Sequence, residues 1–337
     1  MQLVRQKGKL RAYRVRAVLA ALVVAALGSG CAAEGPSGTA GPGTPAGSAA
    51  GNPAGQGPQA GQAEKAERAK RPGAEKPEAR GAAGPAEALS AYADKVRSAQ
   101  KARAAAAKKW GLDKVPLAAP PPPAVKPKIT TRKGFEVEGG EDLPPVFTTV
   151  PTKEKIVFLT IDDGAEKDPE LLRMMSELRI PYSAFLSDYV IKDDYGYFEK
   201  MRDRGVALHN HTLKHPYLPG LSYAAQKREI CGQQDRLEKR YGTRPRLLRP
   251  PYGNYNGDTL RVAKACGIEA VPLWAAEAFP DHMEWREWDR DLHPGDIILT
   301  HFRGKEDWKG TMPDMIRRVM KTVTDKGYAV ARLEDYV

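Results

Sequence analysis

Two adjacent carboxylates, Asp162 and Asp163, follow the apolar run 156–161 and precede Gly164. A run rich in β-branched and aromatic residues that is closed by glycine predicts a buried strand. At the exit of such a strand, two acids cost desolvation and repel each other unless a cation or a proton separates them. One arrangement that relieves both effects has Asp163 bind a metal ion while Asp162 stays beside it as a base. Considered alone, the pair is explained equally well by a loop-capping or helix-capping role.

Three of the six histidines lie between residues 209 and 215. His211 and His215 are four residues apart, so on a helical turn both imidazoles would lie on one face. With Asp163 they make a two-histidine, one-carboxylate set, which leaves positions on a divalent ion open for water and substrate. Two histidines at this spacing are otherwise most often solvent-exposed. We expect His209 to be a strand residue or a partner that supports a ligand.

Two further segments carry residues suited to the same chemistry. Arg249 opens the sequence Arg-Pro-Pro-Tyr-Gly, whose prolines and glycine predict a rigid turn with backbone amides free to point into a site. Arg249 could hold an aspartate ionised, or it could be a surface arginine beside a structural turn. His301 ends the apolar run 297–300 and would reach the end of a strand, although a hydrogen-bonded core histidine fits the same pattern.

The elements that must position these residues alternate between strands and helices from about residue 129 onward. The apolar runs predict strands at 156–161, 182–186, 206–209, 246–249, 270–274, 297–300 and 328–333. Helices are predicted at 169–178, 224–241, 258–266 and 312–326. Seven strands alternating with helices imply an α/β fold with a parallel sheet, either open or closed as a barrel. The candidate residues fall at four strand ends, so we expect them to meet at one rim.

Taken together, the motifs resemble those of the NodB-type polysaccharide deacetylases, which form carbohydrate esterase family four. The family patterns TxDDG, HTxxHP, RxPYG and IxLxH appear in order at 160–164, 211–216, 249–253 and 297–301. The resemblance covers roughly residues 155–337. It implies a distorted seven-stranded (β/α) barrel that removes acetyl groups from an acetylated sugar polymer with the help of a metal ion.

The resemblance also implies which residues bind the metal and activate water. Asp163, His211 and His215 would hold the ion, which is most often zinc in this family, with cobalt, nickel or manganese as alternatives. Asp162 would be the general base that activates the attacking water. Arg249 would orient Asp162. This supplies the strong nucleophile that an amide requires.

The other implied roles concern the acyl group and the leaving amine. The backbone N–H of Tyr252 would stabilise the oxyanion together with the metal ion. His301 would protonate the leaving amine. Leu299 and Trp274 would shape the acetyl pocket, and Tyr252 would also contact the substrate.

One family motif is absent from its usual place. The family carries an Asp-Trp pair whose aspartate hydrogen-bonds the catalytic histidine and raises its pKa, but no such pair follows Trp274. We expect Glu277, Asp281 or Asp289 to reach His301 instead. The first motif also continues Gly-Ala at 164–165 where relatives often have Gly-Pro. These departures leave room for a different substrate or for lost activity.

The N-terminal residues 1–31 have the form of an export signal, which we expect to take the protein out of the cytoplasm. Basic residues between 5 and 16 precede the apolar run 17–27, which is short for a membrane span and ends in small residues. Cys31 follows in a context that resembles a bacterial lipoprotein processing site, except that Leu27 lies one place too far from it. A lipid on Cys31 would tether the protein to the membrane, and cleavage nearby without a lipid would release it.

Residues 32–128 read as a spacer rich in Ala, Gly, Pro and Lys. Within it, 86–109 lacks Gly and Pro and predicts a helix with few large apolar residues, which we expect to lie in solvent or along a polyanion. The folded catalytic domain would then be 129–337. It contains Cys231 and Cys266 on successive predicted helices, which suit either a disulfide in an exported protein or two buried thiols.

The formal net charge of +11 suits a polyanionic environment such as acidic cell-wall polymers. Nucleic acid is the other common partner of basic proteins, but the chain has none of the usual nucleic-acid-binding motifs. Three functions remain: a deacetylase acting on peptidoglycan or another N-acetylated glycan, an O-acetyl esterase acting on a polymer such as xylan, and a glycan-binding protein whose barrel has lost catalysis.

Overall fold

The computed structural model describes residues 84–337. The predicted export signal, Cys31 and residues 32–83 of the predicted spacer lie outside the described residues. No helix within 84–337 is long and apolar enough to cross a membrane.

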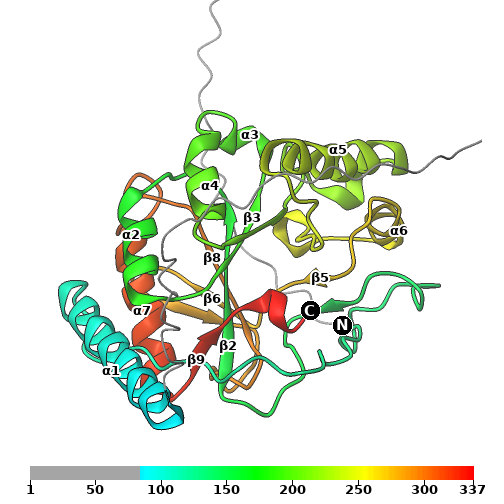
Figure 1. Cartoon of the computed structure of the whole chain (residues 1–337). Coiled ribbons are helices and arrows are strands. Elements are labelled where there is room, and N and C mark those ends of the chain that lie inside the picture. Colours follow the sequence, from blue (N-terminus) through cyan, green and yellow to red (C-terminus); the bar gives the residue numbers. More distant parts are fainter. Residues whose placement is uncertain (1–83) are drawn as a thin grey trace, which may run out of the picture. The chain divides into compact units, whose positions relative to one another are not determined.

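The core of the fold is a seven-stranded sheet that confirms the predicted α/β class (Figure 1). Along the sheet the order is β4-β3-β2-β8-β6-β7, with β9 paired to β2. The strands are β2 (Ile156–Asp163), β3 (Ser183–Leu186), β4 (Ala207–Asn210), β6 (Ala276–Ala278), β7 (Met283–Trp285), β8 (Ile297–His301) and β9 (Ala329–Ala331). All pairings are parallel except β6 with β7. Every residue of β2 is buried, as its continuous apolar run predicts.

Single bridges extend the pairing beyond the sheet. Strands β1 (Val146–Phe147) and β5 (Val271–Pro272) form a separate two-stranded sheet. Isolated bridges join Asn210 to Leu248, Leu247 to Ala270, and Thr149 to Asp296 just before β8. Followed from one segment to the next, these pairings lead from β4 through β5 and β1 back to β8, but part of the path consists of single bridges. The continuous strand predicted at 246–249 is wrong, because only Leu247 and Leu248 form bridges. Pro245 and Pro250 on either side have no N–H group that could pair with a neighbouring strand.

The helices lie outside the sheet (Figure 1). They are α2 (Pro169–Leu178), α3 (Asp188–Ile191), α4 (Tyr195–Arg202), α5 (Tyr223–Tyr241), α6 (Gly257–Ala265) and α7 (Met312–Asp325), with 3₁₀ turns η1 (Leu218–Gly220), η2 (Pro251–Gly253) and η3 (Leu333–Asp335). The predicted bounds of α2, α5, α6 and α7 hold to within one residue. Side-chain caps explain why the starts of α6 and α7 could be predicted. Asn256 forms a capping box with Thr259 at the start of α6, and Thr311 forms one with Asp314 at the start of α7.

Alternation along β2 separates two apolar clusters. Val157, Leu159 and Ile161 pack towards the helices. Ile156 and Phe158 point the other way, into a cluster with Phe185 and Ile297. Side chains on this second face of the strands, at their C-terminal ends, therefore lie at the edge of the second cluster.

The helix α1 (Pro85–Lys109) matches the helix predicted in the spacer, but it is not wholly in solvent. Ala106 and Ala107 are buried, and Trp110, just after the helix, is buried beside them. The Trp110 ring N–H donates to Glu177 of α2 at 2.7 Å, and Lys109 pairs with the same carboxylate. The packed part of the chain therefore begins before residue 129, because two small residues in the last helical turn and the aromatic residue just after it are buried.

Cys231 of α5 and Cys266, which ends α6, form a disulfide. The bond closes a loop with a sequence separation of 35 residues. The sequence left open either a disulfide or two buried thiols, and the structure has the disulfide.

Replacing both cysteines by serine should lower the free energy of unfolding by about 3–4 kcal/mol, the loop-entropy value for a loop of this length. Urea unfolding of the double variant and of the reduced wild type should give the same lowered midpoint. A midpoint equal to that of the oxidised wild type would show that the cross-link contributes no stability.

Candidate functional site

The strand ends bring the predicted residues together. Asp162 and Asp163 end β2, and His301 ends β8 opposite Asp162 in the parallel register. His211 follows β4, and Arg249 follows the bridge between Leu248 and Asn210. The expectation that separate strand ends meet at one rim is thus confirmed in the geometry.

Asp163, His211 and His215 form a cluster whose ligand atoms all lie within 4.8 Å of one another. Asp163 Oδ1 lies 3.4 Å from His211 Nε2 and 3.5 Å from His215 Nε2. This oxygen is buried and has no hydrogen-bond partner. An orphaned buried carboxylate oxygen facing two imidazole nitrogens fits a divalent ion with mixed N and O ligands.

The partner of His211 fixes which of its nitrogens faces the cluster. His211 Nδ1 lies 2.6 Å from the carbonyl oxygen of Arg249, so Nδ1 carries the proton that this oxygen accepts. Nε2 is then the nitrogen that faces Asp163 and that could bind an ion. Metal-binding histidines are commonly held by such a contact.

Backbone strain also concentrates around this cluster. Six non-glycine residues of 84–337 have positive φ, and four of them belong to these loops: Asp163, Thr212, His215 and Tyr252. Such conformations persist only where the surroundings enforce them, and they gather at functional sites.

Arg249 is fully buried and holds Asp162. Its Nη1 donates to Asp162 Oδ1 at 2.8 Å and to the Thr160 hydroxyl at 2.7 Å. Its Nε donates to the Pro272 carbonyl at 2.9 Å. The alternative of a surface arginine is therefore wrong, and the other oxygen of Asp162 stays free, 3.7 Å from His211 Nε2.

Glu277 is the acid that lies beside His301. Its Oε1 is 3.4 Å from His301 Nδ1, because Glu277 of β6 pairs with Leu299 of β8. The other two candidates are engaged elsewhere, Asp281 with His282 and Asp289 with His293. Burial, reinforced by the carboxylates of Glu284 and Asp162, raises the pKa of Glu277 to about 7. Burial also lowers the pKa of His301.

The residues predicted to contact substrate surround this centre. The Tyr252 ring lies 4.6 Å from that of His215 and is largely exposed. Gly253 packs against Trp274, where a Cβ would come within 2.9 Å of the indole. Leu299 is buried two residues before His301, so its side chain points to the same face of β8.

His209, by contrast, lies away from the cluster. Its Nε2 is 2.9 Å from Glu334 Oε1, which also accepts from the Ser183 hydroxyl at 2.6 Å. Burial raises the pKa of Glu334, but the contacts with His209 and Ser183 outweigh it and bring the pKa to about 2. We expected His209 to be either a strand residue or a partner that supports a ligand, and the structure shows the strand residue. Its contact with Glu334 holds the C-terminal turn η3.

The motifs gave no sign of Arg303. Its Nη2 donates to Asp163 Oδ2 at 2.6 Å, and its Nη1 lies 3.6 Å from Asp307. The only indication in the sequence is that the basic residue Arg303 lies two residues after His301, close to the end of a predicted strand.

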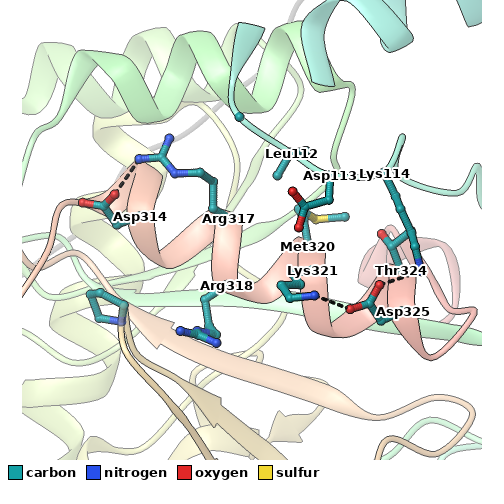
Figure 2. Close-up of a pocket in the computed structure, with 12 residues that line it drawn as sticks. Leu112, Asp113, Lys114, Asp314, Arg317, Arg318, Met320, Lys321, Thr324 and Asp325 are labelled. Carbon is teal, nitrogen blue, oxygen red and sulfur yellow. Dashed lines mark hydrogen bonds and ion pairs between the residues drawn. The ribbon is translucent and has the colours of Figure 1, made fainter. Parts of the chain in front are cut away.

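A separate cavity lies between residues 111–114 and α7 (Figure 2). It has a volume of about 340 Å³, and none of the predicted site residues lines it. Several of its charged side chains pair with one another: Asp314 with Arg317, and Asp325 with both Lys114 and Lys321. The candidate site is therefore the cluster at the strand ends.

The family model for polysaccharide deacetylases matches residues 149–271. An uncharacterised protein of Streptomyces coelicolor is 40% identical over 203 residues, which cover 60% of this chain and 81% of that protein. The peptidoglycan-N-acetylmuramic acid deacetylase PdaA of Bacillus subtilis is 27% identical, covering 55% of this chain and 72% of PdaA. PdaC of the same organism is 30% identical, but the match covers only 41% of its length.

Solved structures show the same fold. A mutant of a Bacillus anthracis pseudoenzyme of carbohydrate esterase family 4, with restored activity, aligns with a TM-score of 0.50 at 20% identity, covering 57% of this chain and 71% of that one. A peptidoglycan N-acetylglucosamine deacetylase aligns with a TM-score of 0.51 at 20% identity, covering 59% and 95%. With the motifs in order and their residues at one rim, the chain belongs to the NodB-type polysaccharide deacetylases of carbohydrate esterase family 4.

Proposed function

We propose that this protein is an exported, metal-dependent deacetylase that hydrolyses N-acetyl groups of peptidoglycan or a related glycan. The observation that carries the proposal is the unpartnered, buried Oδ1 of Asp163, which faces the Nε2 atoms of both His211 and His215. The names of the Bacillus relatives, which state action on peptidoglycan, support the choice of polymer.

Asp163, His211 and His215 would hold the ion, and zinc suits their ligand atoms best, with cobalt, nickel or manganese as alternatives. Bound there, a divalent ion would supply Lewis acidity for the acyl oxygen and for a water molecule.

Asp162 and His301 divide the proton transfers between them. Because Arg249 occupies Oδ1 of Asp162, the free Oδ2 is the atom that would accept the proton of the attacking water. His301 faces Glu277 through Nδ1, so its Nε2 would give a proton to the leaving amine.

The remaining residues would position the acyl group. The backbone N–H of Tyr252, in the strained turn η2, would donate to the developing oxyanion. Leu299 and Trp274 would enclose the acetyl methyl group. The base, acid, oxyanion donor and acyl pocket would then come from four separate segments of the chain.

Glu277 would act on His301 by charge. A carboxylate beside an imidazole favours the protonated ring, and protonated His301 is the form that can serve as an acid. Activity should fall as the pH rises through the pKa of His301. In Glu277→Gln that fall should start at a lower pH, because glutamine cannot ionise and so never supplies the negative charge that favours protonated His301.

The measurement is the pH dependence of kcat/KM for Glu277→Gln, with Glu269→Gln as the matched control, because Glu269 is an exposed glutamate that pairs with Arg246. An unchanged basic limb in Glu277→Gln would show that this acid does not support His301.

The proposed location is outside the cytoplasm. The 1–31 segment would direct export, with Cys31 either lipidated as an anchor or removed. The disulfide between Cys231 and Cys266 supports an oxidising compartment outside the cytoplasm.

Acetate release tests the proposal and separates the three functions. The purified protein, loaded with zinc, should release acetate from acetylated peptidoglycan or from chitooligosaccharides. Release from acetylxylan alone would identify an O-acetyl esterase. Bound metal with no release from any of these polymers would identify a glycan-binding protein without catalysis.

A further inference from the structure

Arg303 joins two parts of the site that come from different strands. It lies two residues after His301 on the chain that leaves β8, and its guanidinium reaches the last residue of β2, Asp163. About a third of its side chain is exposed, whereas Asp163 is buried. The contact is a charge-assisted hydrogen bond of 2.6 Å, a short and strong type.

The backbone around Arg303 is anchored on both sides. Before it, the Phe302 N–H donates to the Asp162 carbonyl at 3.0 Å, and the Glu166 N–H donates to the Phe302 carbonyl at 3.0 Å. After it, the N–H groups of Asp307 and Trp308 both donate to the Gly304 carbonyl. The guanidinium is thus presented to Asp163 from a fixed loop.

The two oxygens of Asp163 therefore have different environments. Oδ2 is bound by Arg303, while Oδ1 has no hydrogen-bond partner and faces the two histidines. The neighbouring Asp162 shows the same division, since Arg249 binds its Oδ1 and leaves Oδ2 free. Each carboxylate of this adjacent pair has one arginine and offers one oxygen to the site.

We propose that Arg303 is a positioning residue that fixes Asp163 as a ligand through Oδ1 alone and couples the loop of His301 to the metal-binding residues. This inference rests on the proposed function in requiring a divalent ion at Asp163, His211 and His215. The polar contacts of Arg303 are with Oδ2 of Asp163 and with Asp307, so it would act on a bound ion through Asp163.

Two opposite effects on metal affinity follow from such a residue. A guanidinium repels a nearby cation, so its charge alone would weaken binding. By holding one carboxylate oxygen, it also keeps the other aimed at the histidines, and loss of a residue that orients a ligand typically costs about 10–100-fold in affinity. A positioning role requires the orienting effect to be larger than the charge repulsion. Removal of the guanidinium must therefore weaken metal binding.

The test is the zinc affinity of the metal-free protein, measured by competition with a chromophoric chelator. We expect Arg303→Met, which keeps the length and loses the donors, to bind zinc at least about 10-fold more weakly than wild type. Arg303→Lys should fall between the two, because an ammonium can donate to Oδ2 but lacks the rigid fork of arginine. Arg261→Met, which removes a surface partner of Asp258, is the matched control and should bind like wild type.

The Co²⁺ absorption spectrum gives a second readout that does not depend on activity, because it responds to the number and geometry of ligands. It should change in Arg303→Met, where Oδ2 is free to join Oδ1, and stay the same in Arg261→Met. Thermal unfolding of the metal-free variants verifies that each is folded.

The outcomes separate this inference from the proposed function. Zinc affinity equal to or tighter than wild type in Arg303→Met, with an unchanged Co²⁺ spectrum, would overturn the positioning role. A wild-type protein that binds no zinc would overturn it as well. Weaker binding in Arg303→Met by a protein that releases no acetate from any glycan would uphold the role of Arg303 and refute the proposed activity.

Discussion

Replacing Asp162 by asparagine should lower kcat for acetate release by about 10²–10⁴-fold, the usual contribution of a positioned general base. Asparagine keeps an oxygen that can accept from Arg249, so the fold around the buried guanidinium should persist. It cannot accept the proton of the attacking water. Because Asp162 is not among the three predicted ligands, zinc affinity should change far less than kcat.

Acetate release and zinc binding measured on the same samples of Asp162→Asn check this expectation. Asp258→Asn is the matched control and should behave as wild type, because Asp258 is a partly exposed residue at the start of α6 that pairs with Arg261. A rate within a few-fold of wild type in Asp162→Asn would exclude Asp162 as the base.

Replacing His211 by alanine should remove both the bound metal and the activity. The imidazole is buried, is held by the Arg249 carbonyl and directs Nε2 towards Asp163. Loss of a residue that merely orients a ligand costs about 10–100-fold in metal affinity, so loss of a ligand should cost more than about 100-fold. His215→Ala should act in the same direction.

Metal content after dialysis and acetate release report the two losses. His293→Ala is a suitable control because His293 is partly exposed and pairs with Asp289 and Asp296, away from the cluster. A His211→Ala protein that still holds one ion per chain with unchanged affinity would show that the ion is bound elsewhere.

Much of the site could be predicted from the sequence because its residues lie at the ends of strongly patterned elements. The run that forms β2 is buried throughout, so its end could be placed to within two residues. The same holds for β8, whose apolar run delivers His301. Once strand ends are known, parallel pairing brings them to one edge of the sheet, and the meeting of Asp162, Asp163, His211 and His301 follows.

What could not be predicted depends on contacts distant in sequence. The hairpin of β6 and β7 has strands of three residues, too short for a periodic pattern, yet its pairing with β8 is what places Glu277 beside His301. The sequence left three acids as candidates because only this register distinguishes them. Arg303 was missed for a similar reason, since its partner Asp163 lies on β2.

Other differences come from local chemistry that pattern reading overlooked. The strand predicted at 246–249 reduces to single bridges beside two prolines. The helix α1 was expected in solvent because it has few large apolar residues, but its last turn buries two alanines, and Trp110 packs just beyond it. Small residues let helices approach closely, and a hydropathy pattern gives them little weight.

The central claim is that one divalent ion at Asp163, His211 and His215 acts together with Asp162 as base. It is tested most directly by titrating zinc into the metal-free protein while acetate release from its best glycan substrate is followed. The account predicts that wild-type activity rises from near zero and saturates at one ion per chain, while Asp162→Asn binds the same ion and stays inactive. Full activity without metal, or zinc-dependent activity in Asp162→Asn equal to that of wild type, would contradict it.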